Sequence, residues 1–147
     1  MKTAFLTLFC LSLTGCIGGS EQEDSSEVVD TGTYEIKRTT ETDGGSWSVA
    51  YEPSPDPIPT TDNFKLYVTI SDIETGELVL GADVEADAAM PEHNHGMNTS
   101  PVVTEVDGGQ YEVTGMQFHM TGHWRIDLEI TVMGETEAAV FHVECCE

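Results

Sequence analysis

The chain has 147 residues, of which 27 are Asp or Glu and five are Lys or Arg, so its formal net charge at pH 7 is −22. So negative a protein repels the phosphates of DNA and RNA, which excludes nucleic acid as the expected partner. The length suits one domain with a hydrophobic core of its own.

The N-terminus has the pattern of a signal peptide over residues 1–15. A single lysine precedes a short apolar run, whereas a membrane-spanning helix needs about 20 apolar residues. The run ends in the tetrad LTGC at 13–16, which resembles a bacterial lipobox. This resemblance implies cleavage before Cys16 and a lipid anchor on that cysteine. The residue after it is Ile17 rather than Asp, which implies the outer membrane, with the domain facing the periplasm. The alternative is an ordinary secretory signal that ends near an incidental cysteine.

Residues 16–44 are expected to form the lipidated cysteine and a flexible acidic tether. The stretch 17–31 is rich in Gly, Ser and acids, a composition that cannot bury a core. Once the signal is removed and Cys16 is lipidated, only Cys145 and Cys146 remain as free thiols. Bridged Cα atoms usually lie about 5.5 Å apart and consecutive ones about 3.8 Å, so a disulfide here would be strained. The fold is therefore expected to depend on its core, and the pair stays as thiols or binds a soft metal.

Residues 45–147 predict an all-β domain, because short segments of period-two alternation recur between turn signals and no helical periodicity competes. The prolines at 53, 55, 57 and 59 interrupt the first segment, and the Asp-Gly-Gly at 107–109 indicates a hairpin. About seven strands in such a length are typical of an immunoglobulin-like two-sheet β-sandwich. The predicted strands are 46–51, 64–73, 78–86, 102–106, 110–118, 123–132 and 138–145.

The longest predicted strand shows how its two faces divide. Trp124, Ile126, Leu128 and Ile130 alternate with polar residues, so they are expected to face the core. His123 falls on the other face of this strand. Met116 and Phe118 are also expected in the core, and a lone His142 is expected to be a surface residue.

Most of the soft metal ligands lie in two short clusters, MPEHNHGM at 90–97 and MQFHMTGHW at 116–124. Neutral imidazole and thioether together suit copper better than calcium or magnesium. The candidate ligands are His93, His95, Met97, His119 and His123, with Met90 and Met120 in reserve. His119 and His123 would meet only if a hairpin turn falls at 121–122, which Gly122 favours. The competing interpretation places Met90 in the core and leaves the histidines to bond backbone or water.

The same clusters, with Gly109-Gln110-Tyr111 between them, resemble the YtkA-like domain over roughly residues 45–145. The resemblance implies an exported, immunoglobulin-like sandwich that is grouped with copper-handling envelope proteins of the CopC type. We therefore expect a lipid-anchored accessory protein that binds copper and hands it to another envelope protein. The alternative is a metal-free interaction module of the envelope. No catalytic arrangement of Ser, His and Asp or of paired acids stands out, so the protein is not expected to be an enzyme.

Overall fold

The computed structural model describes residues 34–146, which form an all-β domain. Within this part of the chain one short 3-10 turn, η1 (Pro91–His93), interrupts the strands, and no helix is long and apolar enough to cross a membrane. The strands in chain order are β1 (Thr39–Glu41), β2 (Trp47–Ser54), β3 (Asn63–Asp72), β4 (Asp83–Met90), β5 (His95–Gly96), β6 (Val102–Asp107), β7 (Gln110–Gln117), β8 (Gly122–Val132) and β9 (Glu135–Cys145).

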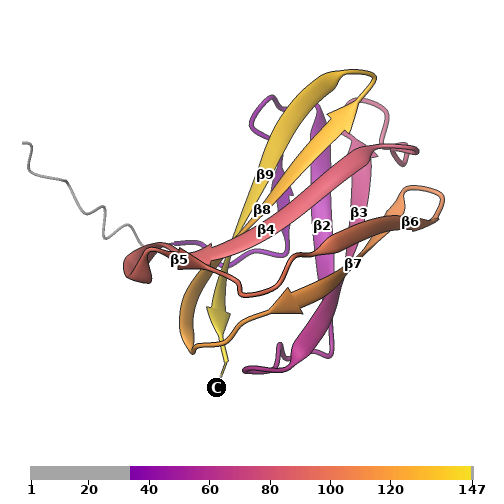
Figure 1. Ribbon diagram of the computed structural model, residues 1–147. Coiled ribbons are helices and arrows are strands. Elements are labelled where there is room, and N and C mark those ends of the chain that lie inside the picture. Colours follow the sequence, from indigo (N-terminus) through magenta and orange to yellow (C-terminus); the bar gives the residue numbers. More distant parts are fainter. Residues whose placement is uncertain (1–33, 147) are drawn as a thin grey trace, which may run out of the picture. The chain divides into compact units, whose positions relative to one another are not determined.

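The strands form two antiparallel sheets, which confirms the predicted β-sandwich. One sheet has the order β1-β2-β3-β7-β6 and the other has the order β5-β4-β8-β9. Figure 1 shows β4, β8 and β9 as one layer across β2 and β3. The hairpin predicted at Asp107-Gly108-Gly109 joins β6 to β7, and Gly109 takes the left-handed φ of +80° that this turn needs.

Alternation along the strands places the core between the sheets. Every second residue along most of β2, β3 and β8 is buried, while the residues between them, apart from His123, are exposed or half-buried. Met116 and Phe118 are buried as predicted, and so is Met90. The larger apolar side chains of the core are Trp47, Val49, Tyr51, Phe64, Leu66, Val68, Ile70, Tyr111, Trp124, Ile126, Leu128, Ile130 and Phe141.

The predicted hairpin at 121–122 is wrong. β7 belongs to the five-stranded sheet and β8 to the four-stranded sheet, so residues 118–121 cross from one layer to the other. Gly122 has a φ of +123°, and a Cβ there would lie 3.2 Å from the Cε of Met90. The glycine therefore lets the crossover pass close above the core rather than turning the chain back along one sheet.

The described domain differs from the prediction at two further places. β1 pairs with β2 in a segment that we assigned to the tether, so the sandwich starts before residue 45. The strand predicted at 78–86 begins only at Asp83, because Leu78 makes a single isolated bridge to Ser71. The side chains of Cys145 and Cys146 meet at the end of β9. The predicted signal peptide and the lipidation site Cys16 lie outside the described residues.

Candidate metal site

β5 is the short return strand that positions His95. It pairs with β4, with His95 opposite Met90 and Gly96 opposite Ala89. Cross-strand partners share a face, and the side chain of Met90 is buried, so His95 lies on the face of the sheet that covers the core. Met97 follows two residues later and packs against the core, where its sulfur accepts the backbone N–H of Gln117 at 3.5 Å.

The crossover between β7 and β8 brings His119 to the same end of the sandwich. Trp124 is fully buried and donates its indole N–H to the carbonyl of Met120 at 3.0 Å, which ties the crossover to the core. Phe118 stacks on the indole at 4.5 Å between ring centroids. His119 is thus held between two residues whose positions the core fixes.

The structure brings together His95 and His119, which are 24 residues apart in the sequence. Their ring centroids lie 4.9 Å apart with planes tilted by 35°. Both rings stand edge-on to the indole of Trp124, with centroid distances of 5.9 Å for His95 and 5.4 Å for His119. The two imidazoles therefore share an apolar floor.

One nitrogen of each ring is buried and has no hydrogen-bond partner: Nε2 of His95 and Nδ1 of His119. The Nδ1 of His95 lies 3.3 Å from the carbonyl oxygen of Gly96, which can only accept a hydrogen bond. Nδ1 therefore carries the proton, and Nε2 presents a lone pair to the interior. A buried imidazole nitrogen without a partner is costly, and a backbone carbonyl bonded to the other nitrogen is the usual support of a metal-binding histidine.

His93 lies at the outer rim of this pair. It is exposed, in the last position of η1, and its ring centroid lies 5.9 Å from that of His95. Asn94 follows in the left-handed region at φ 53°, which turns the chain from η1 into β5. His93 and His95 are thus close, but only His95 reaches the interior side.

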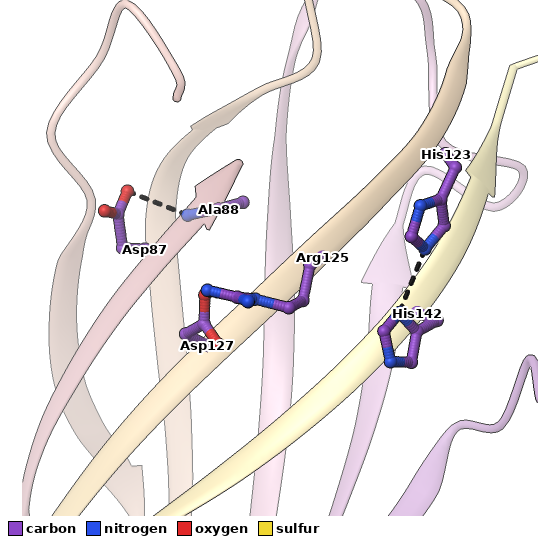
Figure 2. A network of polar contacts seen from close by, with 6 residues as sticks. All are labelled: Asp87, Ala88, His123, Arg125, Asp127 and His142. Carbon is purple, nitrogen blue, oxygen red and sulfur yellow. Dashed lines mark hydrogen bonds and ion pairs between the residues drawn. The ribbon is translucent and has the colours of Figure 1, made fainter. Parts of the chain in front are cut away.

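His123 does not join this cluster. The alternation of β8 places it on the face opposite to Trp124, where its Nε2 is hydrogen-bonded to Nδ1 of His142 at 2.9 Å (Figure 2). The ring of Tyr34 stacks on both imidazoles, at 3.8 Å from His123 and 4.6 Å from His142. His123 is only 5% exposed as a result.

This second pair was not predicted from the sequence, in which His142 is a solitary histidine on the outer face of its strand. His142 is half-buried, and burial is the main cause that lowers its pKa, with His123 and Arg125 acting in the same direction and Asp127 against it. The alternation of β9 does place His142 on the outer face. The register of β9 against β8, which a single sequence does not state, decides that it meets His123.

No three side chains of His, Cys, Asp or Glu gather closely enough to hold a metal ion within residues 34–146. The pair that the structure does bring together is the two imidazoles of His95 and His119, and the thioether of Met97 follows two residues after His95. These ligands are chemically soft, and such a set fits Cu(I) better than calcium or magnesium.

Comparison with known proteins gives a family and a fold. Residues 53–129, more than half of the chain, match the sequence model of a family described as YtkA-like. The matched range includes both histidine clusters, whereas Tyr34 and His142 lie outside it. No curated protein matches the chain.

Two solved structures align with the chain. A DUF4426 family protein of Pseudomonas aeruginosa aligns with a TM-score of 0.54 at 13% identity, over 74% of this chain and 96% of that chain. The filamin domain of Lin-41 aligns with a TM-score of 0.37 at 20% identity, over 58% of this chain and 80% of that domain. At these identities the first supports the sandwich fold alone, and the second is too distant to support an argument.

Proposed function

The chain belongs to the YtkA-like family, and we propose that it is a copper-binding protein of the cell envelope whose site is formed by His95 and His119. One observation carries the proposal: two neighbouring rings each direct a buried, unpartnered nitrogen into the structure. A bound ion would satisfy both nitrogens at once, and it would remove the desolvation cost that each of them now bears.

The surroundings favour Cu(I) among the copper ions. Trp124 and Phe118 form a buried apolar floor, and the thioether of Met97 lies in the next chain segment after His95. Soft sulfur ligands select Cu(I), and a hydrophobic shell limits the access of water. We assign the Nε2 of His95 and the Nδ1 of His119 as nitrogen ligands and the sulfur of Met97 as the third ligand.

The rim of the site offers a route for exchange of the metal. His93 and Met120 are exposed, and each is close in the chain to one member of the half-buried pair, His93 just before β5 and Met120 in the crossover. Their imidazole and thioether are the same ligand types as those inside. We propose that they receive copper from, or pass it to, another copper-handling protein of the envelope, and that the role is binding rather than catalysis.

Competition for Cu(I) tests the site. The full chain is titrated under reducing conditions against a coloured Cu(I) chelator, together with His95→Ala, His119→Ala and Met97→Leu. Loss of an outer-shell partner alone costs about 10–100-fold in metal affinity, so removal of either ligand histidine should weaken binding by about 100-fold or more. Met97→Leu keeps the apolar volume and removes the sulfur, so it should weaken Cu(I) binding and leave the melting temperature close to that of the parent.

His142→Ala is the matched control, since it removes a histidine from the outer face of the same sheet. It should leave the Cu(I) affinity unchanged. A parent chain that fails to compete for Cu(I), or a His95→Ala/His119→Ala variant that competes as well as the parent, would leave the metal-free interaction module as the better description.

We further propose that the domain is anchored through lipid at Cys16, most simply to the outer membrane. The lipobox-like LTGC at 13–16 supports this location. Replacement of the acceptor, Cys16→Ser, should move the protein from the membrane fraction to the soluble fraction of the envelope. Equal membrane fractions for parent and variant would contradict the anchor and leave the copper site untouched.

A further inference from the structure

We propose a second metal site on the outer face of the β8–β9 hairpin, in which His123 and His142 together chelate a divalent cation that prefers tetragonal coordination, such as Cu²⁺. This site is separate from the His95–His119 pair and does not depend on it. The residues that make it come from β8 and β9, and the aromatic ring that covers it comes from the first described residue of the chain.

The register of the two strands places the imidazoles as diagonal neighbours. His123 lies opposite Glu144 and His142 lies opposite Arg125, so both histidines are on one face, two residues out of register. Their Nε2 and Nδ1 atoms are 2.9 Å apart. Two nitrogens that bind one ion in neighbouring positions, at about 2.0–2.1 Å and an angle of roughly 90°, lie about 2.9 Å from each other.

The two hydrogen-bonded nitrogens therefore already lie at about the spacing that a chelated ion requires. In the metal-free pair a single proton lies between them. A bound cation takes the place of that proton, which moves to the other nitrogen of its own ring, so both imidazoles stay neutral and each gives one lone pair. The rings need to turn toward a common point, but the strands need not move.

The burial of His123 distinguishes this pair from two solvent-exposed histidines that are in contact. His123 is 5% exposed on a sheet face that otherwise carries charged residues, because Tyr34 stacks over it at 3.8 Å. Its second ring nitrogen, Nδ1, is buried without a partner. The stacked tyrosine limits the motion of the His123 ring, so the ring loses less conformational freedom when it turns to bind an ion.

The open positions of the ion would be filled by water, since no third His, Cys, Asp or Glu side chain completes a set among the described residues. Glu144 lies directly opposite His123 and contributes negative charge at the rim of the site. Imidazole nitrogens with water in a tetragonal arrangement are typical of Cu²⁺ and Ni²⁺, which separates this site from the soft Cu(I) set at the end of the sandwich.

Titration with Cu²⁺ in the absence of reductant tests the proposal. The full chain with the His95→Ala/His119→Ala changes lacks the first site. It should still bind one Cu²⁺ ion at His123 and His142, with higher affinity than the Cu²⁺ ions that bind to the acidic surface. Its electron paramagnetic resonance spectrum should show coupling to two nitrogens. Addition of His142→Ala to this background should weaken that binding by at least about tenfold and remove the two-nitrogen pattern, because one imidazole alone cannot chelate.

Two variants serve as controls. His93→Ala removes an exposed histidine of η1 that takes no part in the His123–His142 hydrogen bond, and the variant should still bind the Cu²⁺ ion. His142→Gln keeps a polar side chain beside His123, so it tests chelation with less disturbance of the fold, and it should lose the ion as His142→Ala does.

A parent spectrum without two-nitrogen coupling would overturn the proposal without any variant, and so would Cu²⁺ binding that His142→Gln leaves intact. Failure of this site leaves the Cu(I) competition assay unaffected, because that assay reports on His95 and His119.

Discussion

Trp124 and Met120 are joined by a hydrogen bond from the indole N–H to the backbone carbonyl, 3.0 Å long, which fastens the crossover between the two sheets to the centre of the core. The same indole lies beneath both His95 and His119. Core packing and ligand placement therefore depend on one side chain.

Trp124→Phe should weaken both stability and copper binding. Loss of the hydrogen bond leaves the Met120 carbonyl without its partner at a cost of about 1–3 kcal/mol, to which the volume lost beneath the histidines adds. Chemical denaturation measures the first effect, and Cu(I) competition measures the second. Trp47→Phe is the control, because Trp47 is also buried but lies on β2. It should reduce stability and leave the Cu(I) affinity unchanged, whereas equal losses of affinity in both variants would disconnect Trp124 from the site.

Tyr111 also fixes a connecting segment to the core through side-chain hydrogen bonds to its backbone. Its hydroxyl accepts the N–H of Ala82 at 3.0 Å and donates to the carbonyl of Val79 at 2.9 Å, so it holds the segment before β4. Tyr111→Phe keeps the ring and should lower the free energy of unfolding by about 1–3 kcal/mol, since two backbone groups lose their partner. Chemical denaturation measures this loss.

The control for Tyr111→Phe is Tyr67→Phe, on the neighbouring strand β3, where the side chain is half-buried. It should change stability by less than about 0.5 kcal/mol. A Tyr111→Phe variant as stable as the parent would show that the two hydrogen bonds contribute no net stability.

The sequence predicted the fold well where alternation is strong. Trp124, Ile126, Leu128 and Ile130 are buried as expected, because a strand with one buried face must repeat every second residue. The sequence was a poor guide to which strands pair with one another. Gly122 favours a turn, but a glycine with positive φ serves a crossover between sheets as well as a hairpin within one. Three-residue β1 has no alternation to detect, so its pairing was missed.

The candidate site was predicted only in part, because its residues meet through strand pairing, which the sequence does not show. His95 and His119 come together because β5 folds back on β4 and the crossover covers the same end, two facts of topology. The separation of His123 from them was visible in the alternation of β8, which already places it opposite to Trp124. The partner of His123 was not visible, because the meeting with His142 depends on the register between β8 and β9.

Glu137 gives the domain a stability that depends on pH. Its carboxylate accepts hydrogen bonds from the hydroxyls of Ser46 and Thr42 and from the backbone N–H of Ser46, and so links β9 to the loop between β1 and β2. The hydroxyl of Ser46, followed by that of Thr42, lowers the pKa of Glu137 below its ordinary value of 4.5. The folded state therefore binds fewer protons than the unfolded state in this range.

The stabilisation from Glu137 is complete above the unfolded pKa and is lost as the pH falls through the lower folded pKa. The free energy of unfolding of the parent should thus decrease below about pH 4.5. Glu137→Gln removes the titrating group, so the variant should be less stable than the parent at pH 7 and the difference should shrink toward pH 3. Urea unfolding at a series of pH values measures both. Glu135→Gln, an exposed position on the same strand, is the control, and a constant difference across the series would contradict the assignment.

Tyr34 fastens the start of the described chain to the outer face of β8 and β9. Its ring stacks on His123 and His142, and each aromatic pair of this kind contributes about 0.5–1.5 kcal/mol beyond the area it buries. Tyr34→Ala should therefore lower the free energy of unfolding by about 1–3 kcal/mol and expose the ring of His123 to water. Tyr34→Phe preserves the stack and should match the parent. Denaturation gives the stability, and the deuterium exchange of the Cε1–H of His123, followed by nuclear magnetic resonance, gives the exposure. Equal exposure of His123 in the alanine and phenylalanine variants would mean that the strands alone bury it, and that Tyr34 is not what orders the pair.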